Sequence, residues 1–151
     1  MKAPEDTVTL AGSGARLLLR TGATALLWTF HAGHKIVDFA SESSAFPDPL
    51  GVGHATSLLL ALSVESFCGL LVALGLLTRL ACIPVVATML VVLKLALSGA
   101  GHADVQAACL YGIIYGSLIA LGPGRFSLDH VLATRRARAR AAVPNARSVS
   151  Y

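Results

Sequence analysis

Charged residues are scarce in this sequence, and their scarcity already indicates its class. Asp, Glu, Lys and Arg make up 13% of the 151 residues, whereas hydrophobic residues make up 55%. The mean hydropathy is +0.71, and charged residues in an average soluble domain run at about 25%. These values exclude an ordinary soluble globular domain and predict a membrane protein of one domain.

Cysteine is also sparse, and the usual motifs of soluble enzymes are missing. The chain has three cysteines and no C-x-x-C pair. Cys68 and Cys109 fall inside apolar stretches, and Cys82 lies near the end of another. Because thiol–disulfide exchange needs an exposed thiolate with a resolving partner, we interpret all three as buried structural cysteines. The absence of a G-x-S-x-G, P-loop or dinucleotide-binding motif argues against a self-contained active site of the soluble type.

Long apolar stretches account for most of the chain, at about residues 17–39, 55–77, 80–98 and 103–122. Each can cross a hydrocarbon core about 30 Å thick at a rise of about 1.5 Å per residue. The predicted fold is therefore all-α, a polytopic bundle of four transmembrane helices. Its expected parts are a polar N-terminal segment (1–15), the transmembrane domain (16–124) and a basic tail (125–151).

Lys and Arg lie on one side of the predicted bundle. They lie at the start of the first span (Arg16 and Arg20) and after the second (Arg79), whereas the loops around Asp48 and Asp104 carry almost none. By the positive-inside rule, both termini face the cytoplasm. Anionic lipid headgroups, and not nucleic acid, are the expected partner of the basic tail. Its arginines are Arg135, Arg136, Arg138 and Arg140, in a helix with Ser127 as N-cap.

The first span carries a run of ionisable groups near its end. In "WTFHAGHKIVDF" (28–39), the residues at i, i+3, i+4 and i+7 are His31, His34, Lys35 and Asp38. Helical pitch puts these four in one stripe. Charged groups in a bilayer are costly unless they are paired or hydrated, so the stripe must face water or serve a function. We expect it to line a polar pocket between helices.

Glu65 lies near the middle of the second span. The residues on its helical face are small: Ala61, Cys68, Gly69 and Ala73. Small residues mark a face packed closely against another helix, so Glu65 is predicted to point into the bundle, where it must be protonated or paired. The topology puts His31, Glu65, Lys94 and Cys109 in the outer half of the bilayer, and we expect one polar cluster built from all four helices.

Each polar residue has a structural interpretation beside its functional one. Glu65 is either a proton carrier and ligand-binding group or an inter-helix hydrogen-bond partner, and His31 divides in the same way. Lys94 is better explained as a lysine whose ammonium reaches the membrane surface. The histidines near the outer surface, His34, His54 and His102, could gather a copper or zinc ion, although their spacing matches no compact ligand motif.

Three further stretches resemble one family. "HAGHKI" (31–36) resembles a His-Gly-x-x-Lys signature at the end of a first membrane helix. "VESFCGLLVALGLLTRLACIP" (64–84) resembles a membrane Glu followed by Gly-Leu-Leu-Thr-Arg, and "LGPGRFSLDH" (121–130) resembles the exit from a fourth helix. In this order they resemble the DoxX (DoxX/DoxD-like) family of four-helix bacterial inner-membrane proteins. Two residues depart from the pattern: Ala32 replaces the usual Gly, and His34 is an added imidazole.

The resemblance implies a small membrane subunit associated with redox enzymes. DoxD-type relatives belong to thiosulfate:quinone oxidoreductase, and DoxX-type proteins are linked to oxidoreductase assemblies that handle thiols and reactive oxygen. Carried onto this chain, the motif residues are His31, Lys35, Glu65, Thr78, Arg79, Gly122, Pro123, Gly124, Arg125 and Asp129. From Arg79 onward we expect these to serve fold and topology, with Asp129 accepting a hydrogen bond from Arg79 or Arg125.

The preferred hypothesis is a subunit of a redox complex that binds a quinone and receives its electrons from a partner. Glu65 and His31 are the expected catalytic residues. The predicted ligand-binding residues are His31, Lys35, Glu65, Lys94 and Tyr111, with Tyr115 as a second ring that could stack. Two alternatives remain: a non-enzymatic anchoring subunit that packs against membrane proteins or further copies of itself, and a small metal- or solute-handling membrane protein.

Overall fold

Helices form the whole of the regular structure in the part of the chain described, residues 4–99 and 105–141 of a computed structural model. In chain order they are α1 (Pro4–Leu27), η1 (Trp28–Ala32), α2 (Gly33–Val37), α3 (Phe39–Ala45), α4 (His54–Ser63), η2 (Val64–Cys68), α5 (Gly69–Leu74), α6 (Thr78–Leu97), α7 (Val105–Leu121) and α8 (Leu128–Ala141). The two η elements are single turns of π-helix. The all-α prediction is confirmed for these residues.

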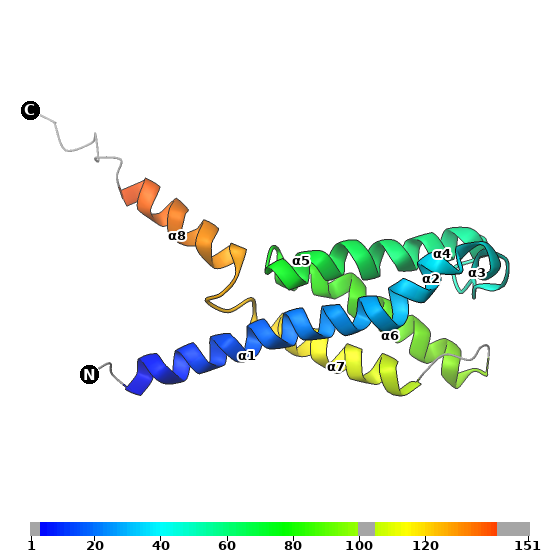
Figure 1. Ribbon diagram of the computed structural model, residues 1–151, viewed down its shortest axis with the longest axis horizontal. Coiled ribbons are helices and arrows are strands. Elements are labelled where there is room, and N and C mark those ends of the chain that lie inside the picture. Colours follow the sequence, from blue (N-terminus) through cyan, green and yellow to red (C-terminus); the bar gives the residue numbers. More distant parts are fainter. Residues whose placement is uncertain (1–3, 100–104, 142–151) are drawn as a thin grey trace, which may run out of the picture.

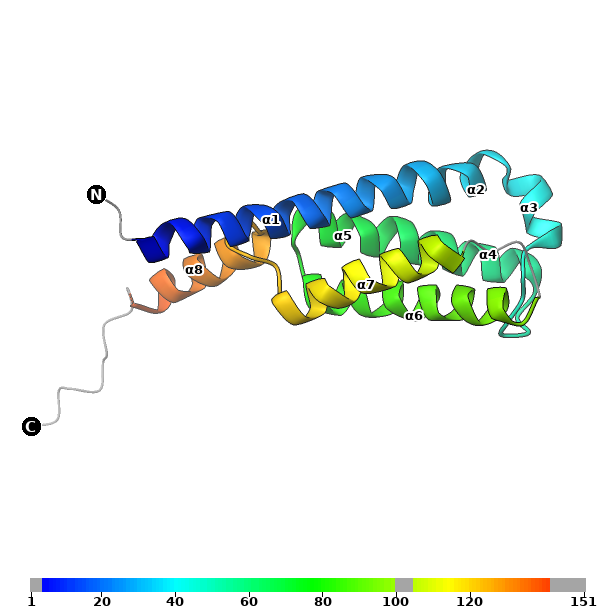
Figure 2. The same ribbon diagram turned by 90° about the horizontal axis from the view of Figure 1, so that it is seen from below.

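The main helices run alongside one another (Figure 1). α1, η1 and α2 follow one another without a break, and so do α4, η2 and α5. α6 and α7 pack against each other, α6 packs against α5 and η2 of the second rod, and α7 packs against α1 of the first. The short helix α3 and the loop into α4 lie at one end, while the start of α1 and the whole of α8 extend from the other (Figure 2).

The boundaries differ from the expected spans in one respect. α1 begins at Pro4, so the segment expected to be a polar lead of residues 1–15 is largely helical. The second rod (54–74) and α6 (78–97) agree closely with the predicted stretches 55–77 and 80–98. α7 begins at Val105, and the first two residues of the expected fourth span lie outside the described part of the chain.

Two of the described helices are long and apolar enough to cross a membrane, His54–Leu74 and Thr78–Leu97. Only 28% and 22% of their most apolar windows are buried inside the molecule. The core helix of a soluble protein would be mostly buried, whereas these helices direct large apolar side chains such as Phe67 and Leu80 outward. α7 is a shorter apolar helix. This surface is suited to lipid.

The buried core lies where α1, α5, α6 and α7 meet. It consists of Ala23, Leu27, Val72, Ala81, Cys82, Val85, Met89, Tyr111, Tyr115 and Leu118. Cys82 is buried here as expected, whereas Cys68 is only partly buried and Cys109 is exposed. The expectation that all three cysteines are buried is therefore wrong for Cys109, which lies on an outward face of α7.

The turn between α5 and α6 is held by the start of α8. Gly75, at φ +71°, ends α5: its N–H donates to the carbonyl of Val72, and the N–H of Leu76 donates to that of Leu71. Such a left-handed cap satisfies carbonyls at a helix end and favours glycine. The carbonyl of Gly75 then accepts from the N–H of Asp129, which brings α8 against the turn.

The Asp129 carboxylate caps the start of α6. Its Oδ1 accepts from the N–H of Leu77 at 2.9 Å, and its Oδ2 accepts from the N–H of Thr78 at 3.2 Å. The expected bond from Arg79 or Arg125 is therefore wrong among the described contacts. The physical reason is that the first amides of a helix lack partners within the helix and attract a negative charge.

Asp48 organises the loop between α3 and α4. Its carboxylate accepts from the Ser57 hydroxyl at 2.7 Å and from the N–H groups of Gly53 (2.7 Å) and Val52 (3.0 Å). The Ser57 bond, followed by the Gly53 bond, lowers the pKa of Asp48 below its ordinary value of 3.8. These bonds to the ionised form join the loop to the first turn of α4.

The lowered pKa predicts acid-sensitive stability. A group whose pKa is lower in the folded state stabilises the fold fully above the unfolded value, and this stabilisation is lost as the pH falls through the folded pKa. The midpoint of thermal unfolding should therefore fall as the pH drops below about 4. In Asp48→Asn this part of the pH dependence should be absent. Equal slopes for the two proteins between pH 5 and pH 2.5, followed by circular dichroism, would contradict the assignment.

Candidate functional site

Two π-helical turns face each other between the first and second rods. η1 contains Trp28 and His31, and η2 contains Glu65. The indole N–H of Trp28 donates to the backbone carbonyl of Glu65 at 3.0 Å. In a regular α-helix this carbonyl would accept from the N–H of Gly69. Here the N–H of Gly69 donates to the backbone carbonyl of Ser66 instead. The π-turn thus opens a backbone acceptor to a side chain of the neighbouring rod, a distortion that is frequent at functional sites.

Gly69 lets the two rods approach at this point. A Cβ added there would lie 3.1 Å from the Trp28 indole nitrogen and 3.3 Å from the methyl carbon of Thr24. The Thr24 hydroxyl donates to the carbonyl of Gly69 at 3.3 Å and lies 3.3 Å from the hydroxyl of Tyr115. A buried polar chain therefore runs from α7 through α1 to α5, directly beside Glu65.

Lys35 and Glu65 form an ion pair across the two rods. The Lys35 ammonium donates to Glu65 Oε1 at 2.5 Å. The Glu65 side chain is 2% exposed and that of Lys35 is 20% exposed. The carboxylate is therefore buried, whereas the lysine remains partly accessible. Glu65 points into the bundle, as the small residues near it predict, and it is paired.

One carboxylate oxygen of this pair is not used. Glu65 Oε2 is buried and has no hydrogen-bond partner among the described residues. A buried carboxylate oxygen without a donor is costly, so it is suited to receive a proton or a donor from a ligand. The ring of Phe46 lies 5.8 Å from the Lys35 nitrogen and covers it from the loop side.

His31 and Tyr111 complete the group. Their ring centroids lie 5.1 Å apart with an interplanar angle of 89°, an edge-to-face contact between η1 and α7. Tyr111 is 6% exposed and belongs to the core. We call Trp28, His31, Lys35, Glu65 and Tyr111 the π-turn cluster.

The structure brings together only part of the expected site. Lys94 and Cys109 are exposed and do not join the cluster, so the polar groups come from three helical rods and not from four. The predicted stripe is divided: His31 and Lys35 are partly buried, whereas His34 and Asp38 are exposed. The extra residue of the π-turn and the end of α2 at Val37 account for this division.

The outer histidines do not assemble a metal site in the described part of the chain. His34 is exposed, and the ring of His54 is hydrogen-bonded through Nδ1 to the carbonyl of Phe46 at 2.5 Å. His102 lies outside the described residues. No group of three His, Cys, Asp or Glu side chains that could hold a metal ion occurs among the residues that were placed.

Two residues at the centre of the architecture were missed in the sequence. Trp28 is one of them: in an apolar span an indole N–H needs a hydrogen-bond acceptor, and this need is the signal that marks the residue. Arg20 was interpreted only as a topology signal. It is 0% exposed and donates to the carbonyl of Phe126 at 2.6 Å, which joins α1 to the segment before α8.

Comparison with known families identifies the scaffold. A DoxX family model matches residues 15–97, more than half of the chain. The chain belongs to the DoxX family. Searches among curated proteins and among solved structures found no match. Together with the apolar outward faces of its helices, the family makes this a DoxX membrane protein.

The matched region contains most of the π-turn cluster of this DoxX protein. Trp28, His31, Lys35 and Glu65 lie within it, and so does the α5–α6 turn. Tyr111 and the "LGPGRFSLDH" stretch lie beyond its end. The family match therefore covers the stretches 31–36 and 64–84 and does not extend to 121–130.

Proposed function

We propose that this DoxX protein is the membrane subunit of a redox complex and that its π-turn cluster binds a quinone. The observation that carries the proposal is the Lys35–Glu65 ion pair with its unused, buried Glu65 Oε2. A structural ion pair would be expected to satisfy both carboxylate oxygens, because an unsatisfied buried acceptor costs about 1–3 kcal/mol. The open position supports a ligand or proton as the missing partner.

The chemistry of the cluster suits a quinone headgroup. Reduction of a quinone to a quinol takes two electrons and two protons. His31 and Lys35 would donate hydrogen bonds to a quinone carbonyl. Glu65, ionised in its pair with Lys35, would take up a proton from water and pass it to a reduced quinone oxygen, and a second uptake would supply the second proton. The ring of Tyr111 would lie beside the headgroup as an aromatic contact. The electrons would come from a partner redox subunit.

The proposed setting follows from charge and surface. We place both termini and α8 on the cytoplasmic side of a bacterial inner membrane, because arginines gather at that end of the bundle. The π-turn cluster would then lie in the outer half of the bilayer. The exposed apolar faces of α4 to α7 suit lipid and a membrane partner, while α8 would rest on anionic headgroups.

Substitution of Glu65 tests the proposal. Glu65→Gln keeps the size and one acceptor but removes the proton carrier and the charge. In the complex purified from its native membrane, we expect turnover with a soluble quinone to fall about 100-fold per complex, the usual scale for loss of a positioned acid or base. Lys94→Gln, which alters an exposed residue outside the cluster, should leave turnover unchanged.

Two results separate the alternatives. A Glu65→Gln complex with full turnover but reduced yield would contradict the quinone role and favour an anchoring subunit. Equilibrium metal analysis of the purified protein addresses the third candidate, because a stoichiometric metal would point to metal handling instead.

A further inference from the structure

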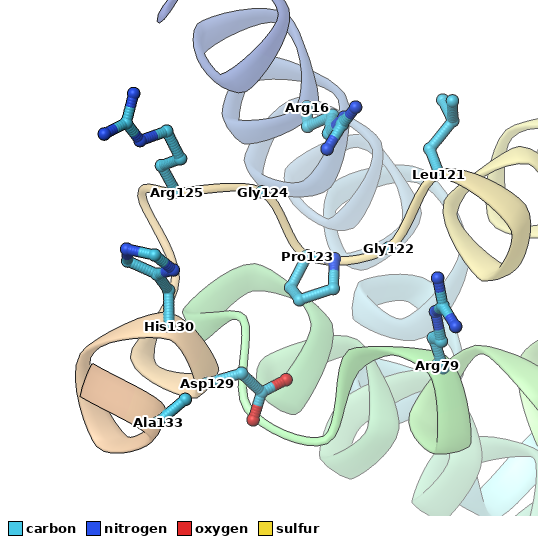
Figure 3. Close-up of a pocket in the computed structure, with 10 residues that line it drawn as sticks. All are labelled: Arg16, Arg79, Leu121, Gly122, Pro123, Gly124, Arg125, Asp129, His130 and Ala133. Carbon is cyan, nitrogen blue, oxygen red and sulfur yellow. The ribbon is translucent and has the colours of Figure 1, made fainter. Parts of the chain in front are cut away.

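A basic pocket lies at the opposite end of the bundle from the π-turn cluster. It has a volume of about 360 Å³ and forms where α7 ends and α8 begins (Figure 3). The loop Gly122–Pro123–Gly124 lines it, and its charged lining consists of three arginines and one carboxylate: Arg16, Arg79, Arg125 and Asp129. These arginines come from α1, α6 and the loop after α7, so the fold itself gathers them.

Two of the arginines lie against the glycines of the loop. A Cβ added to Gly122 would lie 3.2 Å from a terminal nitrogen of Arg79, and one added to Gly124 would lie 3.3 Å from Cδ of Arg16. Both glycines have positive φ, +73° and +78°. Figure 3 shows Arg16 and Arg79 flanking the Gly122–Pro123 stretch, whereas Arg125 points away from it. Arg16 and Arg79 are therefore the pair positioned for a ligand.

Neither Arg16 nor Arg79 is in an ion pair with a described side chain, and the same holds for Arg125. Arg79 donates one long bond, 3.4 Å, to the carbonyl of Ala120, which leaves most of its donors available. The one carboxylate in the lining, that of Asp129, accepts hydrogen bonds from the first amides of α6, at Leu77 and Thr78.

We propose that the pocket binds the phosphate group of an anionic phospholipid between Arg16 and Arg79. Guanidinium groups bind phosphate oxygens through two parallel hydrogen bonds, so two arginines can hold one phosphate from both sides. Basic pockets between membrane helices are known to receive lipid headgroups. Leu121 in the lining and Phe126 beside it are each 48% exposed, which supplies apolar surface for the glycerol and acyl chains.

This site is separate from the arginine-rich face of α8. That face attracts any anionic surface through charge alone, whereas the pocket requires geometry. The proposal does not depend on quinone binding, because the two sites share no residue.

Lipid titration of the full chain in neutral detergent tests the site. Phosphatidylglycerol should bind more tightly than phosphatidylcholine with the same acyl chains, and it should raise the unfolding midpoint. Arg16→Gln/Arg79→Gln should weaken phosphatidylglycerol binding about tenfold or more, since each arginine near an anionic lipid contributes about fivefold. The matched control Arg136→Gln/Arg138→Gln removes the same charge from α8 and should retain the preference.

The remaining outcomes also decide the matter. Equal losses in the two double variants would overturn the site in favour of diffuse charge. Inorganic phosphate that competes through Arg16 and Arg79, with no preference for phosphatidylglycerol, would overturn the lipid source and assign the pocket to a soluble phosphate. If the double glutamine variant does not fold, Arg16→Lys and Arg79→Lys replace it. Each keeps the charge but loses the paired donors, so unchanged affinity in both would contradict the proposal.

Discussion

Lys35→Met is expected to lower the free energy of unfolding by about 3 kcal/mol. The substitution leaves Glu65 with a buried charge and no partner for either oxygen, and breaking one side of a buried pair costs about 3–5 kcal/mol. The lower end of this range applies because the Lys35 side chain is 20% exposed. The measurement is denaturant-induced unfolding in detergent, followed by circular dichroism.

A second substitution should restore most of this loss. In Lys35→Met/Glu65→Gln the uncompensated charge is gone, so the double variant should be more stable than Lys35→Met alone. Lys94→Met provides the matched control, because this lysine is exposed and should change stability by less than about 0.5 kcal/mol. Additive losses from the two single substitutions at Lys35 and Glu65 would show that the pair is not coupled.

Gly75→Ala is expected to prevent stable folding, with a loss of about 3 kcal/mol or more. The added Cβ would lie 1.8 Å from a guanidinium nitrogen of Arg20 and 2.6 Å from Cβ of Ser127. Arg20 has no exposed surface, so its guanidinium would have to leave the carbonyl of Phe126. The left-handed φ of +71° adds strain of about 1 kcal/mol. The yield and the unfolding midpoint of the purified variant measure the effect.

Gly51→Ala isolates the backbone contribution. Gly51 has nearly the same φ, +68°, but a Cβ there would meet no atom within 4 Å. Its substitution should therefore cost only the strain of about 1 kcal/mol. Similar midpoints for the two variants would contradict the role given to the contact between Gly75 and Arg20.

The sequence predicted the helices and the family because both depend on local features. Apolar length located the second and third rods within a few residues, and the spacing of the motif residues indicated DoxX. Polarity placed the start of the first span at about residue 17, and the helix that contains this span begins earlier, at Pro4, because polarity marks the expected membrane surface and not the end of a helix. An arginine was the expected hydrogen-bond donor to Asp129, because opposite charges can be read from a sequence. Backbone amides without a partner at the start of a helix cannot be read in this way.

The candidate site was predictable in part. The small residues on its helical face correctly predicted that Glu65 points into the bundle. Helical pitch correctly predicted that His31 and Lys35 lie near each other. Lys94 is expected in the same half of the bilayer as Glu65, but depth does not determine the direction in which a helix face points. The role of Trp28 depends on the backbone carbonyl of Glu65, which is available to it because η2 is a π-turn. No residue type in the sequence predicts such a turn.

The π-turn in the first rod has a meaning for comparison among relatives. Leu27 and Ala32 are successive buried residues of this rod and lie five positions apart, whereas regular helical pitch would separate them by three or four. One residue more in a turn rotates everything that follows by about 100° about the helix axis. A relative with one residue fewer in Trp28–Ala32 would thus present a different side chain to Glu65, even with every motif letter intact. In an alignment of such proteins, a single-residue gap here records the rotation of a helix and not the shortening of a loop.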